Sequence, residues 1–147
     1  MNRKLLATTS ISIHATPAEV WEALVDPDMI RQYFHGTETV SDWKLGSPIT
    51  FKGEWQGKPY LDKGTILEIN PERELSYSFW SSLSGTDDFE DNYAHVSYHL
   101  SHYHDNTTLI ITQDNLDTEE EVVKAEENWM NVGKHIKKLV EEHSQRG

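Results

Sequence analysis

The stretch 11–34 constrains the fold of this chain more than any other part of it. Its first residues alternate isoleucine with polar side chains, which is the period of a strand with one buried face. Thr16 then precedes Pro17 and lies three residues before Glu19, so the sequence predicts a capping box with proline at the first helical position. Asp26-Pro27 repeats the start signal. The stretch therefore predicts a strand followed directly by two short helices.

The middle of the chain shows the alternation of apolar and polar residues that is typical of strands. One face of each strand is apolar and the other is polar, as in an antiparallel sheet with one side in solvent. Residues 56–59 predict a hairpin turn, and the acidic segment 81–91 predicts a long loop. The predicted strands are centred on residues 49–55, 65–69, 75–80, 94–101 and 109–111.

A long helix is predicted after this sheet. Thr118 and Glu121 form a second capping-box pattern, and apolar residues then recur at spacings of three and four as far as Val140. We expect one α+β domain over residues 1–147, with a core over about 6–142 and about six to seven strands. A helix that crosses a curved sheet leaves room for an apolar cavity where the two diverge.

The net charge of −12 opposes binding to nucleic acid, which needs clustered cations. A solvated acidic face is the simpler interpretation of that charge, and a protein partner with a basic surface is the alternative. With no cysteine, the chain has no disulfide, thiolate metal site or cysteine nucleophile. No apolar run approaches the roughly 20 residues of a membrane span, so we expect no membrane insertion and a cytoplasmic protein.

Five motifs in one order carry a resemblance to a known family. They are ATPAEVWEAL, DPDMIRQYF, WKLGSPITF, GTILEINPERELSYSF and a C-terminal helix with a central tryptophan. Over about Leu6 to Glu142 the chain resembles the activator of heat-shock protein 90 ATPase homologue-like family of the START-like, or SRPBCC, superfamily. The resemblance implies a helix-grip fold around a ligand cavity and no common cofactor. The chain departs from the family pattern at Tyr33, where tryptophan is usual, and at Asn128, where glycine is usual.

Aromatic residues are the main candidates for a ligand site. By their alternation, Phe51, Trp55, Tyr77, Phe79 and Tyr98 point to one face of the sheet, while Trp80 is expected to face away. Trp43 lies before these strands, and the helix adds Trp129, Gly133 and Ile136. A glycine within a helix costs up to about 1 kcal/mol relative to alanine, so close approach of a strand or room for a ligand should offset Gly133.

Catalytic and metal sites have weaker signals. His95 and His99 share a strand face, but they are roughly 13 Å apart, too far to share one ion. The carboxylates of 87–91 and 114–127 are expected to be solvated or to cap the helix. No nucleophile or phosphate-loop motif occurs. The candidates for a cyclase- or hydrolase-like activity are the polar residues Tyr33, Glu54, Tyr77 and Tyr98.

The function expected from these features is non-catalytic binding of a small hydrophobic molecule, aromatic or lipid-like, between the sheet and the C-terminal helix. The segments 35–44 and 81–91 are the expected mouth of the cavity. A protein-interaction module of the co-chaperone or stress-response type is the second hypothesis, and an enzyme acting on a hydrophobic substrate is the third. No cofactor and no metal are predicted.

Overall fold

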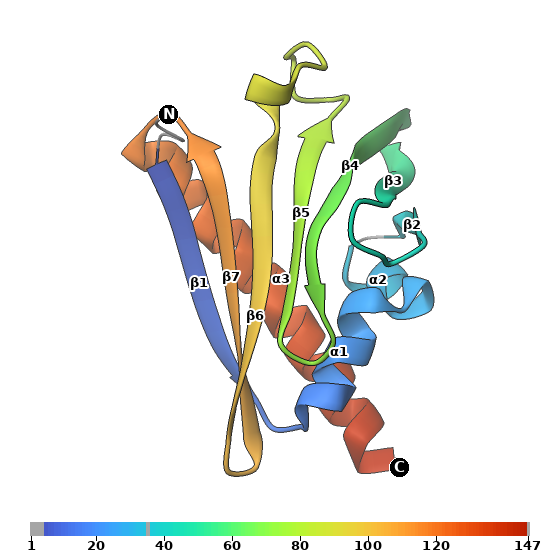
Figure 1. Ribbon diagram of the computed structural model, residues 1–147, viewed down its shortest axis with the longest axis vertical. Coiled ribbons are helices and arrows are strands. Elements are labelled where there is room, and N and C mark those ends of the chain that lie inside the picture. Colours follow the sequence, from blue (N-terminus) through green and yellow to red (C-terminus); the bar gives the residue numbers. More distant parts are fainter. Residues whose placement is uncertain (1–4, 35, 147) are drawn as a thin grey trace.

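A seven-stranded antiparallel sheet curves around one long helix in the structure, a computed structural model that describes residues 5–34 and 36–146. For Trp55 and residues 144–146 it describes the backbone alone. The strand order is β1-β7-β6-β5-β4-β3-β2, and α3 runs diagonally behind the sheet (Figure 1). The strands are β1 (Leu5–Ile13), β2 (Glu38–Ser41), β3 (Pro48–Trp55), β4 (Lys58–Asn70), β5 (Glu74–Ser81), β6 (Ala94–Tyr103) and β7 (Asn106–Leu116). The helices are α1 (Pro17–Val25), α2 (Pro27–Tyr33), α3 (Glu119–Arg146) and the short 3₁₀ helix η1 (Glu90–Asn92).

The predicted start signals place α1 and α2. The amide of Glu19 donates to Thr16 Oγ1 at 3.2 Å, and the amide of Thr16 donates to Glu19 Oε1 at 3.0 Å, so the first capping box is complete. Asp26 ends α1 and caps α2, because its Oδ1 accepts from the amide of Asp28 at 2.9 Å. The strand and two helices of 11–34 are confirmed, and so is the α+β helix-grip fold.

The second capping box forms only in part. The amide of Glu121 donates to Thr118 Oγ1 at 3.1 Å, as predicted. The Glu121 carboxylate, however, accepts from the amide of Asp117 at 2.8 Å. The Glu121 side chain is therefore bonded to Asp117, the residue before the N-cap, and not to the amide of the N-cap residue Thr118.

Three segments differ from their predicted structure. Part of the predicted mouth segment 35–44 is strand β2, and part of the predicted loop 81–91 belongs to η1. Strand β4 begins at Lys58, well before the predicted strand 65–69, because the hairpin pairs Trp55 directly with Lys58. The turn is therefore only two residues long, and the first half of β4 continues the sheet past α2.

The core lies between the concave face of the sheet and the three α-helices. Gly133 of α3 faces Ile11 of β1, where an added β-carbon would stand 3.3 Å from Ile11 Cγ2. The glycine thus lets the helix approach the strand closely. Among the described residues, none of the helices combines the length and apolarity that crossing a bilayer requires.

Strand β1 forms one edge of the sheet, and α3 runs along it. Glu126 Oε2 on α3 accepts from the amide of Thr8 at 3.0 Å. Farther along, Lys137 Nζ donates to the carbonyl of Ser12 at 2.9 Å. Side chains of the helix therefore take up backbone groups that a neighbouring strand would otherwise pair with.

Candidate functional site

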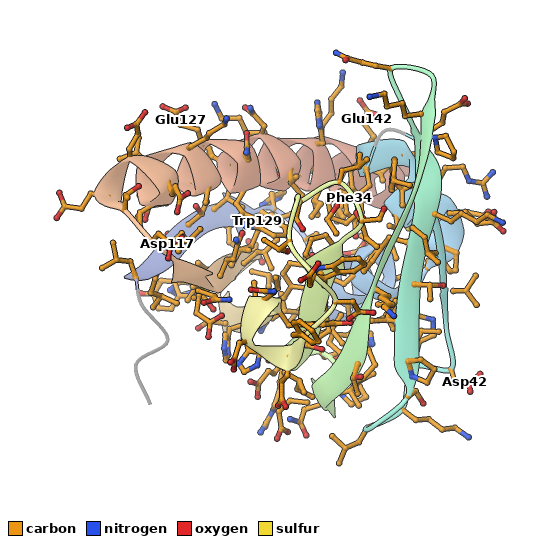
Figure 2. The ribbon with its side chains drawn as sticks, turned by 90° about the horizontal axis from the view of Figure 1, so that it is seen from above. Phe34, Asp42, Asp117, Glu127, Trp129 and Glu142 are labelled. Carbon is orange, nitrogen blue, oxygen red and sulfur yellow. The ribbon has the colours of Figure 1, made fainter. Side chains whose placement is uncertain are left out.

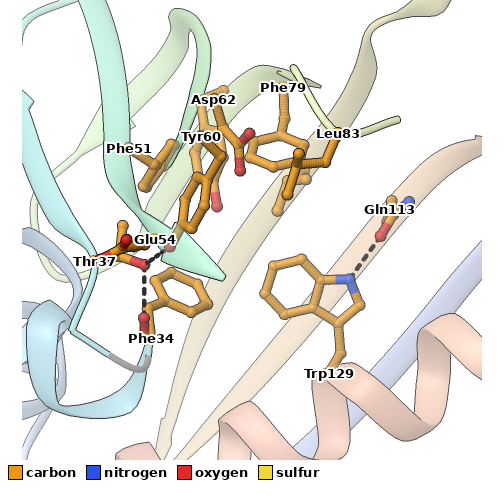
Figure 3. A pocket seen from close by; sticks show the side chains of 12 residues that line it. Phe34, Thr37, Phe51, Glu54, Tyr60, Asp62, Phe79, Leu83, Gln113 and Trp129 are labelled. Carbon is orange, nitrogen blue, oxygen red and sulfur yellow. Dashed lines mark hydrogen bonds between the residues drawn. The ribbon is translucent and has the colours of Figure 1, made fainter. Parts of the chain in front are cut away.

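A cavity of about 540 Å³ lies between the sheet and α3, beside Trp129 (Figure 3). Its size is within the range of small-molecule sites. Most of its lining is aromatic or aliphatic, and its polar groups come from few positions. The lining residues are Phe34, Thr37, Phe51, Glu54, Tyr60, Asp62, Tyr77, Phe79, Leu83, Val96, Gln113 and Trp129.

Aromatic rings from four parts of the chain form the walls. The Phe51 ring on β3 lies 5.6 Å from that of Tyr77 and 5.8 Å from that of Phe79, both on β5. Phe34, which follows α2, lies 6.2 Å from Phe51 and 6.4 Å from Trp129. These separations are those of tilted and edge-on aromatic contacts. The rings are thus packed against one another, which keeps the walls in place.

Two tyrosine hydroxyls meet beneath the cavity. The hydroxyls of Tyr77 and Tyr98 lie 2.8 Å apart, and both residues are buried. Burial raises the pKa of Tyr77 well above its ordinary value, and the neighbouring Tyr98 raises it further. Burial also raises the pKa of Tyr98, although the hydrogen bond with Tyr77 opposes the change. Both phenols therefore stay protonated at neutral pH and act as hydrogen-bonding groups.

Trp129 is held by one specific bond. Its indole Nε1–H donates to Gln113 Oε1 on β7 at 2.8 Å. A second pocket of about 520 Å³ shares Phe34, Gln113 and Trp129 with the cavity. In Figure 2 Phe34 and Trp129 lie beneath α3, whereas Glu127 points outward from the opposite side of the helix. The orientation of the indole therefore sets the boundary between the two pockets.

The opposite end of the cavity carries a chain of hydroxyls. Thr37 Oγ1 donates to the carbonyl of Phe34 at 2.6 Å and lies 2.5 Å from the Tyr60 hydroxyl (Figure 3). Because Thr37 has a single hydroxyl hydrogen, Tyr60 is the donor in the second bond. The Tyr60 ring lies across Gly53 of the facing strand, where a β-carbon would be 2.5 Å from the Tyr60 oxygen.

Two carboxylates also line this end. Asp62 pairs with Phe51 across the β3–β4 ladder and so shares its face of the sheet, and Glu54 lies near the tip of the same hairpin. Burial raises the pKa of Asp62, while hydrogen bonds from Ser81 and Ser82 oppose the change. One carboxylate oxygen of Asp62, Oδ1, is buried and accepts no hydrogen bond from the described residues.

Five of the predicted site residues gather around the cavity. Phe51, Tyr77, Phe79 and Trp129 line it. Tyr98 lies one ring behind, 6.0 Å from Trp129 and in contact with Tyr77. Tyr98 therefore supports the wall and does not form its surface.

The other predicted residues lie elsewhere or outside the described side chains. Trp43 packs against the core on the α2 side of the sheet, near Leu24. Gly133 faces β1, and Ile136 is fully buried in the core. The side chain of Trp55 lies outside those that the structure describes.

Sequence reasoning missed the polar end of the cavity. Thr37 lies in the predicted mouth segment 35–44 but was not named as a site residue, and Tyr60 was missed because the first half of β4 was not predicted. Asp62 alternates with Tyr60, so recognition of that half strand would have placed both on one face. Glu54 was named only as a candidate for activity on a hydrophobic substrate, and it contributes to the lining near the hairpin tip. Phe34, Leu83, Val96 and Gln113 complete the lining that was not predicted.

The predicted mouth segment 81–91 does border the cavity. Leu83 lines it and is 47% exposed, which places this side chain at the opening. The same loop is tied to the outside of the sheet, because Asp88 pairs with Lys63 at 2.5 Å. Trp80 stacks on Tyr93 there, at 6.3 Å between centroids, and so faces away from the cavity as expected.

Two histidines of β6, His95 and His99, have carboxylate neighbours on the outer face of the sheet. His95 Nδ1 lies 3.5 Å from Asp114, and His99 Nε2 lies 3.7 Å from Glu74. Within the described part of the chain, no group of three or more histidine and carboxylate side chains is arranged to hold a metal ion. His95 and His99 therefore add nothing to the cavity, which lies on the other face.

Comparison with known proteins identifies the relatives of this chain. The family model described as "Activator of Hsp90 ATPase homolog 1-like protein" matches residues 14–141. The solution structure of ChR145 from Cytophaga hutchinsonii is 43% identical, with 99% of each chain covered and a TM-score of 0.86. A comparison with curated proteins finds no match.

More distant structures share the fold. CalU16 from Micromonospora echinospora is 21% identical, with 93% of this chain and 82% of that chain covered and a TM-score of 0.70. The Aha1 dimer from Colwellia psychrerythraea is 14% identical, with 92% and 96% covered and a TM-score of 0.73. At these identities the likeness concerns the arrangement of the elements and not the lining of the cavity.

Proposed function

The chain belongs to the Activator of Hsp90 ATPase homolog 1-like family, and from that premise we propose that it binds a small hydrophobic molecule in the cavity beside Trp129 and does not transform it. The family fold is that of a ligand-binding or interaction module. The observation that carries the proposal is a cavity of about 540 Å³ whose walls are aromatic rings fixed by their own packing. Binding would gain about 25 cal/mol for each Å² of apolar surface removed from water.

The tyrosine hydroxyls and the Trp129 indole near the cavity support binding without catalysis. The hydroxyls of Tyr77 and Tyr98 bond to each other, and the Trp129 indole bonds to Gln113. Proton transfer is most effective when the pKa of the catalytic group lies near the working pH. Burial moves the pKa of both tyrosines away from that range.

The test is a titration with pyrenemethanol, a neutral and flat aromatic probe. Saturable shifts of the Trp129 indole and of amides near Phe51 and Tyr77 are expected in NMR spectra. Phe79→Ala removes one wall and should weaken binding about tenfold or more. Phe89→Ala is the matched control, because Phe89 is 66% exposed on the neighbouring loop and does not line the cavity.

Two outcomes would overturn the proposal. The first is a titration in which no cavity residue shifts while the protein is folded. The second is equal weakening by Phe79→Ala and Phe89→Ala. If Phe79→Ala does not fold, Leu83→Ala at the half-exposed opening takes its place.

A protein-interaction role is the second candidate, favoured by the net charge of −12. A basic partner surface would be attracted to this acidic chain, and its binding would weaken as salt screens the charges. This role would be supported in place of small-molecule binding by two results together. The protein would capture one partner in a salt-sensitive way, and it would fail to bind pyrenemethanol.

A further inference from the structure

We propose that the ligand carries a protonated amine, which it places beside Asp62, and that the cavity rejects ligands with a carboxylate at this position. The proposal rests on the proposed binding function and names its ligand class. Three observations carry it. The hydroxyl donors at this end of the cavity are already bonded to other groups, the charged side chains that line the cavity are all negative, and the Asp62 carboxylate has an oxygen that accepts no hydrogen bond from the described residues.

The hydroxyl donors at this end are already used. Thr37 gives its only hydroxyl hydrogen to the carbonyl of Phe34, so Tyr60 gives its own to Thr37. Neither side chain keeps a hydrogen for a ligand. A carboxylate ligand here would lose its bonds to water and find no hydroxyl to replace them, which is costly.

The charges at this end have one sign. The described side chains that line the cavity include two carboxylates, Glu54 and Asp62, and no lysine, arginine or histidine. Lys63 follows Asp62 in β4 but pairs with Asp88 on the outer side of the sheet. A ligand anion would therefore meet repulsion, whereas an ammonium group would meet two acceptors.

The Asp62 carboxylate lacks a full set of partners. Its Oδ1 is buried and accepts no hydrogen bond from the described residues. In Figure 3 the carboxylate lies between Tyr60 and Phe79 and points into the cavity. A buried carboxylate with an unused acceptor is stabilised by a nearby cation that also donates hydrogen bonds.

The far end of the cavity offers no equivalent position. Gln113 Oε1 there accepts from Trp129, and the surrounding surface comes from aromatic rings. An aromatic amine would thus lay its ring along Phe51 and Phe79 and direct its ammonium group toward Asp62. This orientation follows from one polar end and one apolar end in the same cavity.

Three probes with one ring system separate this inference from the proposed function. Pyrenemethanol tests the cavity itself, and pyrenemethylamine and pyreneacetate add opposite charges to the same ring. Affinities are measured for the folded full chain at neutral pH. We expect the amine to bind at least about tenfold more tightly than the alcohol, and the carboxylate more weakly than the alcohol.

Two variants assign the effect to Asp62. Asp62→Asn should lower the ratio of amine to alcohol affinity about tenfold. Asp42→Asn is the matched control, since it removes the same charge from an exposed position that does not line the cavity (Figure 2). If Asp62→Asn does not fold, Glu54→Gln at the exposed end of the hairpin tests whether the carboxylates that line the cavity, and not the net charge, set the preference.

The outcomes are distinguishable. If the alcohol does not bind, the proposed function fails. If the alcohol binds but the amine has no advantage over the carboxylate, the inference fails and the proposed function stands. If Asp42→Asn and Asp62→Asn reduce the ratio equally, the preference comes from the net charge of the chain and the assignment to Asp62 is wrong.

Discussion

The Tyr60 ring lies directly across Gly53, its partner on the neighbouring strand, and occupies the space that a side chain at Gly53 would fill. A β-carbon there would stand 2.5 Å from the Tyr60 hydroxyl oxygen and 2.7 Å from the ring carbon that bears it. The pair therefore fixes the position of the hydroxyl that reaches Thr37. One backbone position thus determines the shape of the polar end of the cavity.

Gly53→Ala should displace the Tyr60 ring and break its bond to Thr37. The methyl group meets the far end of a side chain, so the chain should still fold, with a net change in stability within about 1 kcal/mol. The measurement is NMR of the Tyr60 ring and the Thr37 amide, with Gly133→Ala as a control far from this end. An unchanged Tyr60 environment would contradict the finding.

Gly64→Ala should destabilise the fold strongly. A β-carbon at Gly64 would stand 1.6 Å from the carbonyl oxygen of Ser78, so the backbones of β4 and β5 must move apart. We expect a loss of about 2–3 kcal/mol, measured by urea unfolding.

Gly133→Ala is the contrasting substitution. Its β-carbon would meet only the Ile11 side chain, at 3.3 Å, while alanine favours the helix by about 1 kcal/mol. The two effects should nearly cancel. Equal losses of stability in Gly64→Ala and Gly133→Ala would show that the close approach of β4 to β5 is not as described.

The Tyr77–Tyr98 hydroxyl pair should behave as a unit. Either single change to phenylalanine leaves one buried hydroxyl without its partner and should cost about 1–2 kcal/mol. The double variant should cost less than the sum, with a coupling of about 1 kcal/mol in a double-mutant cycle. Additive losses would mean that the two hydroxyls, 2.8 Å apart, contribute independently.

Asp62 should make the fold less stable as pH rises. Burial raises the pKa of Asp62 above the ordinary value of 3.8, so the folded chain holds this proton more tightly than the unfolded chain. Stability is therefore lost as pH rises from 3.8 through the higher folded value. Asp62→Asn should be more stable than the unaltered protein at neutral pH, and this advantage should shrink below that interval.

Urea unfolding at several pH values measures this difference. Asp42→Asn supplies the comparison, since Asp42 is exposed. A stability advantage of Asp62→Asn that grows as pH falls would have the wrong sign and would refute the stated cause.

Local signals in the sequence were sufficient for the helices and for most of the sheet. Thr16 and Asp26 start α1 and α2 through short-range hydrogen bonds that the sequence spells out. Phe51 and Phe79 were placed on the cavity face by alternation alone. These features depend on neighbours a few residues apart, which is why one sequence is enough to predict them.

The rest depends on two features that the predicted pattern did not contain. Trp43 adopts a positive φ of 55°, and its ring packs against the core away from the cavity. The polar end depends on the pairing of β3 with β4, which sets Tyr60 opposite Gly53 and Asp62 opposite Phe51. The turn type and loop length of a hairpin set its register, and the two-residue turn Gln56-Gly57 was predicted as the longer turn 56–59.

The bonds between α3 and the edge strand β1 have a consequence for self-association. Glu126 accepts from the amide of Thr8, and Lys137 donates to the carbonyl of Ser12. In addition, Glu141 Oε2 accepts from the amide of His14 at 2.8 Å. An exposed edge strand is the usual template for domain swapping and amyloid growth. Since these groups are already bonded, this edge is protected against polymerisation through added strands for as long as the helix stays docked.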